Sequence, residues 1–217
     1  MRYTLLKVTV KGVVLWDYHL RRLAPELGPG SQAQGPLIEF AKNAGPGVWA
    51  LWADHGKGLR VERRPGSRLR DGMPFRMLPS PLSGDAGPFP KPSAPSIYDS
   101  VRVEGIATLL TSPGLVGEPE VYEACCAAVV AWDGSHIVCA PKDRARVWST
   151  AEAAIREHLT AREALLPADS DALLLVNAVK GTCALAAPRS DGFPTMVRAE
   201  IEAVLEQLAR RPHASEG

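Results

Sequence analysis

The stretch that decides the fold is residues 122–159, YEACCAAVVAWDGSHIVCAPKDRARVWSTAEAAIREHL. It contains an apolar run of strand length, Ala124 to Trp132. Asp133-Gly134 follows as a tight turn, because glycine tolerates the positive φ that two-residue hairpin turns require. A second short run, His136 to Cys139, ends just before Pro141. The pattern therefore predicts a strand, a tight turn and a second strand.

The same stretch ends in the start of a helix. Ser149-Thr150-Ala151-Glu152 opens a helical pattern that continues to Leu159. A helix N-terminus has unsatisfied N–H groups and a positive dipole end, so it suits an anion. Ser149 and Glu152 also form a capping box, which explains both residues without any ligand. At the other end, Glu123 opens the hairpin beside small apolar residues, where an unpaired carboxylate is costly to bury and a partner is favoured.

Composition narrows the class of protein. The chain has 217 residues, of which 46% are hydrophobic and 23% charged, as in ordinary globular proteins. Its formal net charge of +1 gives no footprint for nucleic acid or an anionic membrane. No signal-peptide core is present, and no apolar run approaches the ~20 residues that span a bilayer. We expect a soluble, cytoplasmic protein that acts on a small molecule.

Cysteine and histidine usage argues against a metal centre. The four cysteines include the adjacent pair Cys125 and Cys126, which point to opposite faces of a strand. No Cys-x-x-Cys pair exists and the five histidines are scattered, so no metal site is predicted. Buried thiols in a reducing compartment are the favoured interpretation.

Outward from the central stretch, the first half reads as strands and helices in alternation. Strands are predicted at 3–10, 13–16, 48–53, 58–64 and 75–78, and helices at 19–27 and 35–43. Residues 79–96 then hold six prolines and two glycines, which can neither join a sheet ladder nor continue a helix. We interpret this segment as an interdomain crossing, which divides the chain into domains at 1–88 and 89–217.

The second half adds helical patterns at 97–110, 161–166 and 195–208, with buried strands at 172–179 and 181–185. Because the strands come in hairpins, two α+β domains fit better than a parallel α/β sheet.

Four motifs carry a resemblance to a known family. They are His19-Leu20-Arg21-Arg22-Leu23, Lys91 followed seven residues later by Tyr98-Asp99, Glu123 at the hairpin, and Leu175 to Gly181 (LVNAVKG). In these the chain resembles the class IV aminotransferases, which include the aminodeoxychorismate lyases and bind pyridoxal 5′-phosphate (PLP). The resemblance implies the two-domain fold of the D-amino-acid aminotransferase type, a cleft between the domains, and a homodimer.

The resemblance also implies a role for each residue. Lys91 would be the catalytic lysine that binds PLP covalently, and burial would favour its reactive neutral amine. Glu123 would hold the pyridine nitrogen protonated. Arg22 would bind the phosphate in a two-pronged contact, together with the helix start at Ser149 and Thr150.

Each assignment has a plainer alternative, and the chain departs from the family pattern. Lys91 lies between two prolines and reads equally as a linker lysine, and Arg22 as a surface arginine on an amphipathic helix. Residues 124–128 (ACCAA) replace the family's Gly-Thr-x-Ser-Asn. Leucines stand around Leu5-Leu6 in place of a Glu-Thr pair. Glu152 stands near where many members carry arginine, so it would repel a phosphate.

The sequence therefore predicts a PLP-dependent lyase or aminotransferase that acts on a small amine or amino acid. The alternative is a homologue without the cofactor. Such a protein would serve as a binding or scaffold protein, or as a PLP-independent catalyst on an aromatic or chorismate-like ligand.

Overall fold

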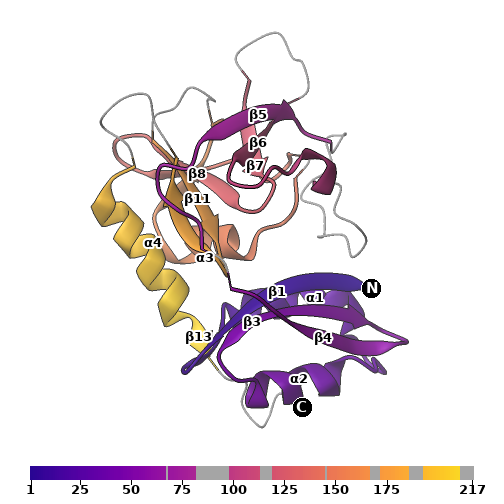
Figure 1. Ribbon diagram of the computed structural model, residues 1–217. Helices are drawn as coiled ribbons and strands as arrows, with labels where there is room; N and C mark the ends of the chain where they lie inside the picture. The colour runs from indigo at the N-terminus through magenta and orange to yellow at the C-terminus, as the bar shows by residue number, and fades with distance from the viewer. Residues whose placement is uncertain are drawn as a thin grey trace.

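The computed structural model describes residues 1–66, 68–81, 98–112, 119–144, 146–166, 172–185 and 193–210. The N-terminal sheet and its helices lie in the lower half of Figure 1, and the other two sheets lie above them. This α+β architecture, with strands in hairpins, is the one that the sequence predicts.

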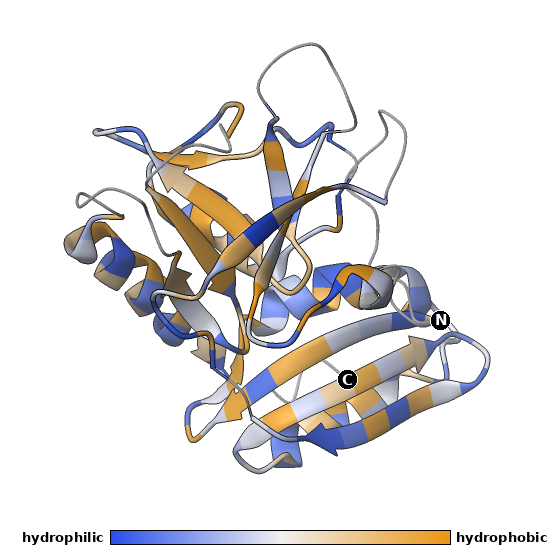
Figure 2. Cartoon of the chain, turned by 45° about the horizontal axis from the view of Figure 1, so that its top comes forward, coloured by the Kyte–Doolittle hydropathy of each residue, from blue (hydrophilic) through white to orange (hydrophobic). Residues whose placement is uncertain are grey.

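The first sheet has the strand order β13-β2-β1-β3-β4. Its strands are β1 (Arg2–Thr9), β2 (Gly12–Val14), β3 (Gly47–Asp54), β4 (Gly58–Arg64) and β13 (Ala209–Arg210). Thr4, Leu6 and Val8 of β1 are buried and alternate with half-buried residues, so one face of β1 points to the core. Figure 2 shows the same alternation of hydropathy along these strands.

Helices cover the buried face of this sheet. They are α1 (Trp16–Leu23), the short η1 (Ala24–Glu26) and α2 (Gln34–Asn43). Trp16, Leu23 and Leu37 from the helices share one core cluster with Leu6 and Leu51 from the strands. The opposite face, which carries Leu5 and Lys7, is left for the second half of the molecule.

The second sheet has the order β10-β9-β8-β11-β12. Its strands are β8 (Ala128–Trp132), β9 (Ile137–Cys139), β10 (Ala161–Glu163), β11 (Leu173–Asn177) and β12 (Gly181–Ala184). Nearly every position of β8, β9 and β11 is buried, so these strands are covered on both faces. Figure 2 shows them as almost continuously hydrophobic.

Two layers cover the second sheet. Helices α3 (Thr150–His158) and α4 (Thr195–Gln207) pack on one face with Ile155 and Ile201 in the core. On the other face lies a small sheet of β5 (Phe75–Pro79), β6 (Ala107–Thr111) and β7 (Val121–Ala124). Helix α4, yellow in Figure 1, runs down to β13 and so returns the chain to the first sheet.

Three local predictions were wrong. Residues 97–110 were expected to be helical, but within the described part they form the 3₁₀ turn η2 (Asp99–Val101) and strand β6. Residues 161–166 supply the edge strand β10, parallel to β9, in place of a short helix. The apolar run 124–132 is broken, because the backbones of Ala124 and Ala127 bond each other in a tight turn at 3.0 and 3.3 Å. In the first two cases pairing with another strand overrides local spacing, and in the third a tight turn separates β7 from β8.

The predicted boundary between residues 88 and 89 lies outside the described residues and stays a prediction. Strand β5 precedes that boundary in sequence and pairs in parallel with β6, which follows it. Within the described parts of the chain, no helix is both long and apolar enough to cross a membrane. No group of three or more metal-binding side chains is found there either.

Candidate functional site

Arg22 lies at the end of α1, which starts at Trp16 directly after Leu15, a residue with the left-handed backbone angle φ of 55°. Its guanidinium donates to the carbonyl oxygen of Trp148 and lies over the Trp148 ring, 5.4 Å from the centroid. The enclosed Nε has no hydrogen-bond partner among the described residues. Burial lowers the pKa of Arg22 to about 10, and no described carboxylate offsets this. The arrangement leaves a cationic donor available to an anion.

The N-terminus of α3 lies on the same side of the cavity as Arg22. Ser149 is its N-cap, and the Ser149 hydroxyl accepts a hydrogen bond from the Glu152 N–H at 3.3 Å. Within the described residues, the N–H groups of Thr150 and Ala151 have no hydrogen-bond acceptor. These free N–H groups and the helix dipole favour a negative charge next to Arg22.

Glu123 sits in β7 with only 5% of its surface exposed. The Tyr98 hydroxyl donates to its Oε1 at 2.5 Å, and the Val147 N–H donates to Oε1 and Oε2 at 3.1 and 3.2 Å. Burial raises the pKa of Glu123 to about 7, although these hydrogen bonds act in the opposite direction. Tyr98 and Val147 are therefore the hydrogen-bond partners that the sequence analysis expected for this carboxylate.

Glu152 does not act as the sequence suggested. Its carboxylate, with 2% of the side chain exposed, is bound by two arginines and so does not close the capping box. Arg146 Nη2 and Arg156 Nε both donate to its Oε1 at 2.8 Å, and Arg146 Nη1 donates to Oε2. The expectation that Glu152 repels a phosphate is therefore corrected, because the two guanidinium groups offset the charge of its carboxylate.

A cavity of about 90 Å³ joins these groups. Four of the five predicted site residues line it, and they are Arg22, Glu123, Ser149 and Thr150. Its remaining walls come from Leu5, Tyr98, residues 124–128, Arg146 to Trp148, and Val176 to Val179. The fifth, Lys91, lies outside the described residues, so its role stays a prediction. The apolar wall at 124–128 is where the sequence loses the hydroxyls and amide of the family pattern.

Sequence reasoning missed two residues of this site. Arg146 is 4% exposed and lines the cavity, and its Nε has no hydrogen-bond partner among the described residues. Trp148 supplies both the carbonyl and the ring that hold Arg22. A loop arginine normally reads as solvated, so the available signal was Glu152 itself, a carboxylate on the apolar face of α3 beside Ala151 and Ile155.

Contacts between α1 and α3 hold together the two helices that contribute Arg22 and the free N–H groups to the cavity. The Tyr18 hydroxyl donates to Glu157 Oε2 at 2.9 Å, and Arg21 donates to both carboxylate oxygens at 2.5 and 3.1 Å. Arg21 also stacks on the Tyr18 ring at 4.4 Å. These bonds fix the helix that carries Arg22 against the helix whose N-terminus opens toward it.

The described residues fit PLP. The free Nε of Arg22 and the free N–H groups at the start of α3 suit its phosphate. An ionised carboxylate has about four lone-pair positions. Three bonds reach Glu123, so one position is open to a further donor such as a protonated ring nitrogen.

Sheets, helices and their order together give the chain the fold of the class IV aminotransferases and aminodeoxychorismate lyases, the fold-type IV PLP enzymes. This confirms the predicted fold. No family model matches the sequence, and no curated protein matches it.

Three solved structures illustrate the likeness. A candidate 4-amino-4-deoxychorismate lyase from Legionella pneumophila superposes with a TM-score of 0.65 at 15% identity, over 95% of this chain and 90% of that one. The 4-amino-4-deoxychorismate lyase of Pseudomonas aeruginosa gives 0.58 at 17% identity, over 95% and 90%. A hypothetical aminotransferase from Mycobacterium tuberculosis, solved with PLP bound, gives 0.61 at 17% identity, over 96% and 88%. Identities this low show the fold and leave the activity to be argued from the site.

Proposed function

We propose that this protein is a PLP-dependent enzyme similar to 4-amino-4-deoxychorismate lyase or a class IV aminotransferase, and that it acts on a small amine or amino acid. The observation that carries the proposal is Arg22, whose enclosed guanidinium lacks an anion and lies beside the free N-terminus of α3. A half-buried cation is costly without a counter-charge, and a phosphate dianion would supply one. We expect a homodimer, as the resemblance implies.

In this proposal, the groups that line the candidate site have the following roles. Arg22 and the N–H groups of Thr150 and Ala151 bind the phosphate and so hold the cofactor in place. Glu123 is kept in position by Tyr98 and Val147. A protonated ring nitrogen beside Glu123 would pull its pKa below the value of about 7, so that the carboxylate stays ionised near neutral pH.

When bound, PLP supplies an electron sink that stabilises negative charge next to the substrate's amine carbon. The chain's contribution is an apolar wall at residues 124–128, beside which charge interactions are stronger than in water. Lys91 is the proposed group that attaches the cofactor and moves a proton at the substrate carbon.

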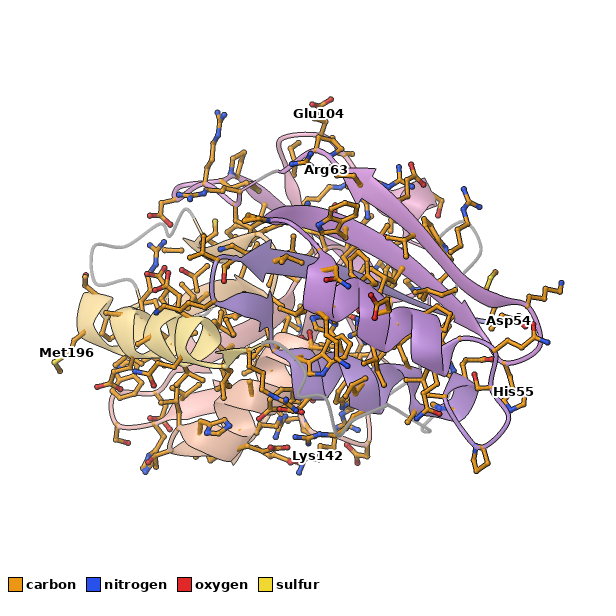
Figure 3. The ribbon with its side chains drawn as sticks, turned by 90° about the horizontal axis from the view of Figure 1, so that it is seen from below. Asp54, His55, Arg63, Glu104, Lys142 and Met196 are labelled. Carbon is orange, nitrogen blue, oxygen red and sulfur yellow. The ribbon has the colours of Figure 1, made fainter. Side chains whose placement is uncertain are left out.

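The decisive experiment is the absorption spectrum of the purified protein after incubation with PLP. An enzyme should show a near-visible band that borohydride reduction removes, and peptide mapping should then find the reduced cofactor on Lys91. Attachment at Lys142 or Lys180 would refute the role of Lys91. The Lys142 side chain is an exposed surface group in Figure 3, and its amine is paired with Glu163 at 3.2 Å.

One observation favours the alternative without cofactor. The Glu123 carboxylate already receives three hydrogen bonds, and the cavity beside it measures only about 90 Å³. If neither absorbance nor calorimetry detects PLP binding, the cleft is a ligand-binding site or a PLP-independent catalyst. The same calorimeter would then be used with chorismate and 4-aminobenzoate as aromatic or chorismate-like probes.

A further inference from the structure

A second and larger cavity lies between the two halves of the molecule. Its volume is about 770 Å³, and its walls come from β1, the turn after it, the segment between β4 and β5, the β11–β12 turn and α4. We call this cavity the basic cleft, because four cationic residues line it in addition to the ion-paired Arg198. They are Lys7, Lys11, Arg68 and Lys180. They come from three separate segments of the chain, because Lys7 and Lys11 both belong to β1 and the turn after it, so the fold and not local sequence assembles them.

None of these four cations has an ion pair within the described parts of the chain. A fifth cation of the lining, Arg198, shows the contrast, because it pairs with Asp71 at 2.7 Å and with Glu202 at 3.1 Å. Glu206 is the remaining carboxylate of the lining and is unpaired there too. Four unpaired cations thus face one unpaired carboxylate. Like charges around one cavity repel each other, and a bound anion relieves that repulsion.

The floor of the basic cleft is apolar. Val8, Val14 and Leu205 line it and are at most 6% exposed. Small-molecule sites typically combine such an apolar lining with a few charged groups, within ~300–1,000 Å³. A cavity of about 770 Å³ is large enough for an organic molecule.

We propose that the basic cleft binds an organic anion that carries at least two phosphate or carboxylate groups. Two or more anionic groups are required because the cations come from both halves of the molecule. Lys7 and Lys11 belong to the N-terminal sheet and its first turn, and Lys180 belongs to the β11–β12 turn of the second sheet. The ligand would therefore bridge the two halves, whose separation is seen in Figure 1. This inference stands apart from the proposed function.

A ligand there would contact the wall of the smaller cavity. Asn177, Ala178 and Val179 line both cavities. Asn177 Oδ1 accepts hydrogen bonds from the Val179 and Lys180 N–H groups at 2.8 and 3.0 Å, and its Nδ2 donates to the Cys126 carbonyl. An anion on Lys180 thus acts on the turn that closes the candidate active site.

The test is isothermal titration calorimetry at low salt on protein without PLP, with ATP, tripolyphosphate and citrate as probes. We expect at least one probe to bind once per chain with a Kd below about 1 mM. The double variant Lys7→Ala/Lys180→Ala should weaken binding at least about tenfold. The matched control is Lys57→Ala, in the β3–β4 turn with Asp54 and His55, which lies on the opposite side of the molecule from α4 in Figure 3.

Each result of these titrations has one interpretation. Tighter binding of ATP and tripolyphosphate assigns phosphate groups to the ligand, and tighter binding of citrate assigns carboxylates. No binding by any probe, or equal loss in the double variant and in Lys57→Ala, overturns the proposal. Tighter binding of a single-stranded RNA than of all three probes overturns it too. An unchanged urea midpoint confirms that the double variant is folded, and Lys180→Gln alone should still weaken binding about threefold.

Discussion

Replacing Glu152 with Gln tests whether the carboxylate belongs to a buried charge network or merely to a helix cap. Its side chain is 2% exposed and its partner Arg146 is 5% exposed, so the change leaves a buried guanidinium without a counter-ion. Removing one partner of a buried ion pair costs about 3–5 kcal/mol. The lower part of that range is expected, because Arg156 keeps its bond to Glu163 at 2.8 Å and Arg146 keeps the Ala140 carbonyl. If Glu152 only placed a negative charge in the first turn of α3, the change would cost about 0.3–1 kcal/mol.

Urea unfolding followed by circular dichroism measures the difference, and an unchanged m-value shows that two-state behaviour persists. Glu163→Gln is the matched control. It removes a carboxylate that pairs with the same Arg156 but is 39% exposed, so it should cost less than about 1 kcal/mol. A loss below about 1 kcal/mol for Glu152→Gln would refute the network as a buried structural unit.

Three further predictions concern the candidate active site. Arg22→Gln should weaken PLP binding by about ten- to a hundredfold, because it removes a charged hydrogen bond to the phosphate. The affinity for pyridoxal, which has no phosphate, should stay unchanged. Absorbance titration measures both, and Arg60→Gln, an exposed arginine of β4 that does not line the cavity, should bind PLP normally. Glu123 has its pKa raised to about 7, so between about pH 4.5 and 7 the folded state holds more protons than the unfolded state, and stability falls as pH rises. Glu123→Gln should remove up to about 3 kcal/mol of this pH-dependent decrease in the free energy of unfolding. The urea midpoints at pH 5 and pH 8 should therefore differ less in the variant than in the parent protein. Lys91→Ala should abolish covalent attachment of PLP; a reduced adduct retained elsewhere, detected by mass spectrometry, would contradict it.

Local signals predicted the parts of the fold that are defined by local chemistry. Asp133 accepts the Ser135 and His136 N–H groups in the predicted turn, at 2.9 and 2.7 Å, and Ser149 caps α3 as expected. The helix predicted over residues 107–110 was wrong, because a short apolar run suits a buried strand and a helix equally. Only pairing with β7 and with β5, which lies about 30 residues earlier in the sequence, decides between the two.

The residues of the candidate site also differ in whether the sequence alone could predict them. Arg22 and Glu123 could be predicted because each stands in a recognisable motif, and the fold brings them to one cavity. Arg146 could not, because it lies six residues before Glu152 in a loop, a spacing that no helix or strand rule favours. The basic cleft was equally hidden, since its cations are spread from Lys7 to Lys180 and the net charge of the chain is only +1.

The return of the chain to its first sheet has a consequence for biosynthesis. Strand β13 pairs with β2 through Ala209 and Val14, and the Leu15 N–H donates to the Leu208 carbonyl at 3.2 Å. While the ribosome is still translating, β2 has a free outer edge, and such edges recruit strands from other chains. The N-terminal half therefore stays open to misassembly until α4 and β13 have been made. Contacts this distant in sequence form late and slow the search for the native state, so nascent chains arrested before residue 195 should be the aggregation-prone species during synthesis.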